Sequence, residues 1–245
     1  MRSSKRPPKK SLRVCPISDM DIKILASGSG GNCYRLSDGV TDILLECGIP
    51  KHRIMAGIGY EVGRIGGVLI THEHGDHAKA ARDMLYFGRD IYASRGTFDA
   101  LGLSGYHCKA VAHGQLFTVG TFSVYPFDVQ HDAAEPLGFV ITSKKTGERL
   151  LFFTDTYYVK YVFKGVDIIM GEVNYSTKTM RDDLPESRKN RLFESHMSLE
   201  HFLELLDSYP QVKKIYLLHL SDDNSDAEMF RREVAKKTGA EVYVC

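Results

Sequence analysis

The feature that most constrains this chain is the stretch 72–77, His-Glu-His-Gly-Asp-His, which holds three imidazoles and two carboxylates. The segment before it, 66–71, is apolar and rich in glycine and β-branched residues, which predicts a buried strand. In the segment after it, 76–87, apolar residues recur at helical spacing. The motif therefore falls on a loop between a strand and a helix, where its side chains can converge without disturbing a core.

The spacing within this motif predicts two neighbouring metal positions. In an extended loop His72 and His74 point to the same side and can bind one ion. Asp76 and His77 begin the helix and point to a neighbouring position, where they can bind a second ion. Imidazoles with a carboxylate suit Zn²⁺, Mn²⁺ or iron rather than a thiolate site. A solvated polar loop is the alternative, but the full motif after a buried strand favours metal.

The composition excludes several classes of protein. With 245 residues, 43% of them hydrophobic, the chain can form one large α/β domain or two small ones. Its five cysteines are scattered without a Cys-x-x-Cys pair, which argues against a disulfide framework. No apolar run is long enough to span a membrane, and no apolar signal core follows the basic start. We therefore expect a cytoplasmic protein without a membrane segment.

The N-terminal segment differs in composition from the rest. Residues 1–19 are rich in Ser, Pro, Lys and Arg, and six of the 32 basic residues fall within 1–13, where there is no acid. The chain has 31 acids, so the part beyond the arm is mildly acidic. We expect a disordered basic arm at 1–19 and a single domain over 20–245. The arm can seek phosphate or simply solubilise the chain, and we favour the second interpretation.

The earlier half of the chain is rich in predicted strands, and strands and helices alternate in the later half. This order predicts an α/β fold, an αββα sandwich in which two mixed β-sheets pack face to face with helices on both outer sides. The turn 27–32 lacks the third glycine of a dinucleotide fingerprint, so no nucleotide cofactor is expected. The expected strands are 21–26, 33–36, 42–46, 66–71, one near Ile91, 116–119, 121–127, 137–142, 149–154, 166–170, 213–218 and 241–244. The expected helices are 76–87, one from Thr97, 199–206 and 226–236.

Three further metal donors stand at or just past the ends of predicted strands. These are His131, Asp155 and His219, each of which follows an apolar segment. Each of them alone could be a turn former or a cap. Together they give the donors that a two-metal site needs beyond the first motif.

His196 has a different setting. It precedes Ser198, which predicts a helix N-cap. An imidazole beside free backbone N–H groups can bind phosphate or protonate a leaving oxygen, and a purely structural residue is the equal alternative.

Taken together, the motif and these donors resemble the ligand series of the metallo-β-lactamase superfamily. Within it, the chain resembles the YycJ/WalJ group of nucleases or phosphodiesterases. The matching segments are 27–34, 71–77, 131–136, 154–156, 172–174, 196–198 and 219–224. The resemblance implies two ligand sets joined by a shared carboxylate. These are His72, His74 and His131 for the first ion, Asp76, His77 and His219 for the second, and Asp155 between them.

The resemblance implies two divalent ions, Zn²⁺ or Mn²⁺, and exonuclease-like hydrolysis of DNA. Two ions roughly 3.5–4 Å apart generate a hydroxide at neutral pH and stabilise charge on the attacked phosphorus. Asp76 is then the candidate to orient or deprotonate the water, and His196 becomes a candidate phosphate or acid–base residue. The alternatives are a phosphodiesterase on small or cyclic nucleotides, a thioester or lactone hydrolase, and a metal-free binding module.

Two positions depart from the group's pattern. Glu46 stands where an Asp commonly supports the metal loop, which puts that support in question. Tyr175 stands where a His tends to follow the Asn of the segment 172–174.

Tyr157 and Tyr158 beside Asp155 are candidates for stacking on a base. Basic residues that weakly favour a nucleic acid are Lys144, Lys145, Arg181, Arg188, Lys189 and Arg191.

Overall fold

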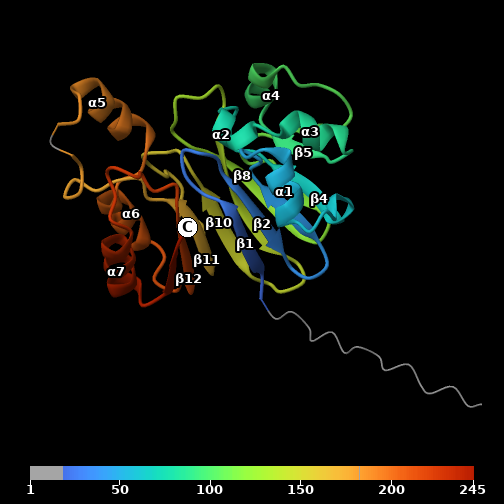
Figure 1. Cartoon of the computed structure of the whole chain (residues 1–245). Coiled ribbons are helices and arrows are strands. Elements are labelled where there is room, and N and C mark those ends of the chain that lie inside the picture. The colour runs from blue at the N-terminus through green and yellow to red at the C-terminus, as the bar shows by residue number, and fades with distance from the viewer. Residues whose placement is uncertain (1–18, 182) are drawn as a thin grey trace, which may run out of the picture.

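The computed structural model describes residues 19–181 and 183–245, whose strands form two sheets (Figure 1). The first sheet keeps its strands in chain order, with antiparallel pairs among the first three strands and parallel pairs from the third onward. Its strands are β1 (Asp21–Ala26), β2 (Cys33–Ser37), β3 (Asp42–Leu45), β4 (Ile65–Leu69), β5 (Ile91–Ala93) and β6 (Cys108–Ala110).

The second sheet also runs in chain order and is also mixed. Its first four strands pair antiparallel, and its last four pair parallel. Its strands are β7 (Phe117–Val119), β8 (Phe122–Asp128), β9 (Leu137–Ser143), β10 (Arg149–Phe153), β11 (Ile168–Glu172), β12 (Lys214–Leu218) and β13 (Glu241–Val244).

Helices cover the outer face of each sheet (Figure 1). The helices are α1 (Lys51–Gly57), α2 (Gly75–Ala78), α3 (Ala81–Tyr86), α4 (Arg95–Leu101), α5 (Glu186–Ser195), α6 (Leu199–Leu206) and α7 (Ala227–Thr238), with a 3₁₀ turn at Val62–Arg64. Apolar residues of α1, α3 and α4 pack on the first sheet, and those of α6 and α7 pack on the second. The predicted αββα sandwich is therefore confirmed.

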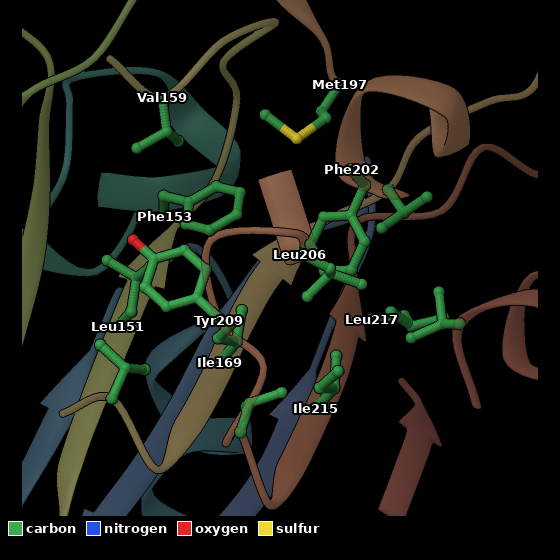
Figure 2. Packing of buried hydrophobic residues seen from close by; sticks show 14 of the residues in the cluster. Leu151, Phe153, Val159, Ile169, Met197, Phe202, Leu206, Tyr209, Ile215 and Leu217 are labelled. Atoms are coloured by element: carbon green, nitrogen blue, oxygen red, sulfur yellow. The ribbon is translucent and has the colours of Figure 1, made fainter. Parts of the chain in front are cut away.

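The strand β10 shows how the sequence builds these layers. Alternate side chains of a strand point to opposite faces. Leu150 and Phe152 accordingly pack between the two sheets, while Leu151 and Phe153 pack under the helices. Figure 2 shows the second of these cores, where the ring of Phe153 faces that of Phe202 on α6, with centroids 6.2 Å apart. An apolar strand buried on both faces has no need of polar alternation.

Several predicted boundaries were wrong. The single helix expected at 76–87 is divided into α2 and α3, because the backbone N–H of Ala80 leaves the helix to donate to the carbonyl of Cys47. The strand expected at 166–170 is β11, which begins two residues later. The helices α1 and α5 and the strand β6 were not predicted; α5 is polar along most of its length and gives no apolar period.

Other predictions are confirmed or fall outside the structure. Ser198 caps α6 as expected, since its side chain accepts a hydrogen bond from the N–H of His201. The predicted basic arm at 1–19 lies outside the described residues except for Asp19, and a single domain over 20–245 stays a prediction. Among the described helices, none combines the length and the apolar character needed to cross a membrane.

A buried carboxylate ties the two sheets together at one end. Asp38, in the turn between β2 and β3, accepts hydrogen bonds from the backbone N–H groups of Val40 and Thr41. It also accepts them from the hydroxyls of Thr121 and Ser143, which belong to the second sheet's side of the sandwich. Burial raises the pKa of Asp38, but these donors outweigh it and hold the pKa below its ordinary value.

We expect Asp38→Asn to lower the free energy of unfolding at pH 7 by about 1–3 kcal/mol, because charge-assisted hydrogen bonds to a buried carboxylate are lost. A depressed pKa contributes stability above the unfolded-state pKa and loses it as pH falls through the folded-state pKa. The gap between wild type and variant, measured by urea denaturation, should therefore narrow below about pH 4. A gap that stayed constant down to pH 3 would contradict this account.

Candidate metal centre

The seven predicted ligands come from four separate segments at one edge of the sandwich. Residues 70–77, the loop after β4 and the start of α2, carry four of them, and His131 lies in the loop between β8 and β9. Asp155 follows β10, and His219 follows β12. Side chains beyond the carboxyl ends of neighbouring strands meet at the same edge of a sheet, which explains why distant residues come together here.

The first group of donors is formed by His72, His74, His131 and Asp155, whose ligand atoms all lie within 4.8 Å of one another. Nε2 of His131 lies 3.2 Å from Nδ1 of His74 and 3.6 Å from Oδ2 of Asp155. Nε2 of His72 lies 3.8 Å from the same oxygen, is buried and has no hydrogen-bond partner among the described residues. A buried donor left unpaired and facing other donors fits a metal ion.

The second group is formed by Asp76, His77 and His219, again with Asp155. Nε2 of His77 lies 3.3 Å from Oδ2 of Asp76 and 3.3 Å from Oδ2 of Asp155. Nε2 of His219 lies 3.4 Å from Oδ2 of Asp76, and its Nδ1 lies 3.6 Å from Oδ1 of Asp155. Imidazole and carboxylate donors in two adjoining groups fit divalent ions, so the chain binds metal.

Burial and neighbouring charges set the protonation of these donors. Burial and the imidazole of His77 hold the pKa of His72 well below its usual value, so His72 is a neutral donor. Burial raises the pKa of Asp155, but His219 and His77 outweigh it and keep this pKa low. Burial lowers the pKa of His219, yet Asp155 and other carboxylates raise it to about 10. A metal ion bound at His219 would therefore have to displace a proton from it.

Glu172 orients two imidazoles from behind. Its Oε1 accepts from Nδ1 of His196 at 2.6 Å and lies 3.1 Å from Nδ1 of His219. Its Oε2 accepts from the backbone N–H groups of Thr156 and Met197. With Nδ1 engaged in this way, Nε2 of His219 is the nitrogen turned to Asp76. The sequence analysis named Glu172 only within the matching segment 172–174 and did not predict this role. An acid at the end of a buried strand could have indicated it.

His196 lies beside the two donor groups. Its ring stacks on that of His219 with centroids 5.6 Å apart and lies 5.9 Å from the ring of His131. Because Glu172 holds Nδ1, Nε2 is the nitrogen left for a substrate. Burial lowers the pKa of His196, but the Glu172 carboxylate outweighs it and raises this pKa above its usual value.

The turn 27–32 is a support for the metal loop, which sequence reasoning did not predict. The backbone N–H of Asn32 donates to the carbonyl of Asp76 at 2.7 Å, and its side chain lies 3.2 Å from Nε2 of His77. Gly48 crosses directly beneath, and a Cβ built on it would lie 1.6 Å from the carbonyl oxygen of Asp76. Only glycine permits this approach.

The structure shows what Glu46 and Tyr175, the two departures from the group's pattern, contact. The carboxylate of Glu46 is fully buried, accepts from the N–H of Thr71 at 3.2 Å and has Oε1 3.7 Å from Nδ1 of His77. The longer side chain therefore reaches the metal loop. Tyr175 is buried, and its ring packs against Phe193 of α5 with centroids 5.6 Å apart.

Two glutamates hold the irregular loop that carries His131. Glu73, inside the metal motif, accepts from the N–H of Ala134 at 2.8 Å. Glu135 accepts from the N–H of Gly96 on α4 at 2.7 Å. The loop is thus fixed to the first sheet's side of the molecule at Ala134 and at Glu135, three and four residues after His131, which limits how far His131 can move.

The basic and aromatic candidates are dispersed. Lys144 and Lys145 follow the far end of β9, whereas the end of β9 near Leu137 is bonded to the metal loop through Thr71. Arg191 of α5 is beside the centre and forms a 3.7 Å ion pair with Asp132. Tyr157 lines a groove beside His131.

A family model described as a beta-lactamase superfamily domain matches residues 36–220. The chain belongs to the metallo-β-lactamase superfamily, and with its two donor groups it is a metal-dependent hydrolase of that class. The predicted family is therefore confirmed.

The curated relatives narrow the comparison. The chain is 29% identical over 235 residues to the exodeoxyribonuclease YycJ of Bacillus anthracis, covering 89% of this chain and 88% of that protein. It is 30% identical over 226 residues to the exodeoxyribonuclease WalJ of Streptococcus pneumoniae, covering 84% and 83%. The solved metallo-β-lactamase-fold protein YhfI of Bacillus subtilis has a TM-score of 0.73 with 16% identity, covering 92% of this chain and 95% of that one. This last likeness is one of fold.

We expect Gly48→Ala to displace the loop of Asp76 and to weaken metal binding at least tenfold, because the added methyl overlaps backbone rather than a movable side chain. Isothermal titration of the metal-free protein with Zn²⁺ checks this. Gly63→Ala is the matched control, since its Cβ meets nothing within 4 Å. Equal affinities in the two variants would show that the close approach is not required.

Proposed function

We propose that this protein is a dinuclear-metal phosphodiesterase that hydrolyses DNA in an exonuclease-like manner. The observation that carries the proposal is the place of Asp155, whose Oδ2 lies within 3.8 Å of His72, His77 and His131. These contacts are to Nε2 of each ring, two in the first donor group and one, of His77, in the second; the other oxygen lies 3.6 Å from Nδ1 of His219, which Glu172 engages. One carboxylate thus joins two donor groups, as a bridging ligand must.

The proposed ligands follow from this arrangement. Zn²⁺ or Mn²⁺ suits their donors, and two such ions supply a nucleophile at neutral pH and bind the non-bridging oxygens of a phosphodiester. The first ion would be held by His72, His74 and His131, the second by Asp76, His77 and His219, with Asp155 shared.

Two side chains handle protons in this proposal. The carboxylate of Asp76, directed between His77 and His219, orients the attacking water and accepts its proton. Nε2 of His196 donates a proton to the leaving oxygen, since the carboxylate of Glu172 fixes the other nitrogen and favours the charged imidazole. A metal-free binding module would not need this complete set.

The choice of DNA rests on the two relatives named exodeoxyribonucleases, which align with most of this chain. We test it by digesting end-labelled single- and double-stranded DNA with Mn²⁺. Asp76→Ala should abolish shortening, and Asp99→Ala, an exposed change on α4, should not. Shortening of the labelled DNA by the Asp76→Ala variant would contradict the two-metal mechanism. Intact DNA with metal-loaded wild type would favour a small or cyclic nucleotide.

The role of His196 has its own test. Protonation matters for a poor leaving group and hardly at all for p-nitrophenolate. His196→Ala should therefore lower kcat on DNA about 10²–10⁴-fold while affecting thymidine 5′-(p-nitrophenyl phosphate) much less. His201→Ala, on α6, is the control. Equal losses on both substrates would assign His196 to phosphate binding instead.

A further inference from the structure

A groove beside the metal centre shares one of its donors. The groove has a volume of about 430 Å³, and His131 lies in its wall. Nε2 of His131 faces His74 in the first donor group, so a molecule in the groove is one side chain away from the reacting centre. The volume lies within the range of about 300–1,000 Å³ found for small-molecule sites.

Three separate segments build this groove, and its lining is polar. The loop after β8 contributes Gln130, the loop after β10 contributes Tyr157, and α5 contributes Ser187 and Asn190. None of the described lining residues is aliphatic, so the groove suits a polar ligand better than an acyl chain. Amide and hydroxyl groups can pair with base edges and sugar hydroxyls, and a tyrosine ring can stack on a base.

The charge of the groove is concentrated at one point. Arg191 is the only lysine or arginine among its described lining residues. Its guanidinium lies 3.7 Å from Asp132, and the two side chains are 70% and 50% exposed, so this ion pair is weak and a phosphate can replace the carboxylate. Asp132 and Glu194 line the same groove and disfavour any further phosphate there.

We propose that the groove binds the nucleotide next to the scissile bond, with Arg191 on the phosphate at the far side of that nucleotide. This rests on the proposed function and names the residues that recognise the strand. In this arrangement the scissile phosphate lies at the metal centre and the base stacks on Tyr157. Arg191 binds the next phosphate, and the groove offers no cation to the phosphates beyond it.

The test compares Arg191→Gln with Arg188→Gln, which removes the same charge from the same helix but does not line the groove. Each protein is assayed on single-stranded oligonucleotides and on bis(p-nitrophenyl) phosphate, a diester with no second phosphate. Arg191→Gln should lower kcat/KM for the oligonucleotide, relative to kcat/KM for the small diester, about tenfold or more, as expected for a lost charge-assisted bond. It should also reduce the slope of log KM for DNA against log salt by about 0.7, the value for one phosphate contact on a single strand.

Arg191→Lys separates charge from geometry. It should restore the salt slope but recover only part of the ratio, because an ammonium lacks the two parallel donors. DNA cleavage with equal ratios and slopes in Arg191→Gln and Arg188→Gln would overturn the groove assignment alone. Turnover of the small diester without any cleavage of DNA by wild type would overturn both the assignment and the proposed function.

Discussion

The buried carboxylate of Asp155 is the interaction on which the rest of the site depends. It is 3% exposed and lies among imidazoles from both sheets' loops, so its charge is stabilised only while those loops stay in place. Its backbone adopts a left-handed φ of 47°, a conformation that few non-glycine residues take but that Asp tolerates better than most. The turn that ends β10 is therefore one that an aspartate can make.

The surrounding structure holds the donors from outside. Glu172 fixes two imidazoles, Asn32 fixes the carbonyl of Asp76, and Glu73 fixes the loop of His131. These supports come from both halves of the sandwich, so the geometry of the centre depends on how the two sheets pack. Placing donors in advance lowers the cost of ordering them when metal and substrate bind.

The exposed wall of the site follows different rules. The helix α5 is polar, projects at the end of the molecule that carries the metal loop (Figure 1) and ends at Ser195, whose carbonyl lies 3.3 Å from Nδ1 of His131. Few apolar contacts hold such an element, and its polar side chains remain available to a ligand. In the proposed function the metal centre supplies the chemistry, and this wall supplies contacts that would distinguish one phosphodiester from another.

Local sequence determined most strands, the cap of α6 and the metal motif, because period-two burial, capping and ligand spacing depend on neighbouring residues. The sequence also predicted His131, Asp155 and His219 as metal donors, and the structure brings them together. Only the tertiary structure decided the division of α2 from α3, the support by Glu172 and Asn32, the reach of Glu46 and the groove under α5. Each of these is a contact between residues distant in the chain, and no local pattern records which distant backbone or carboxylate will lie opposite.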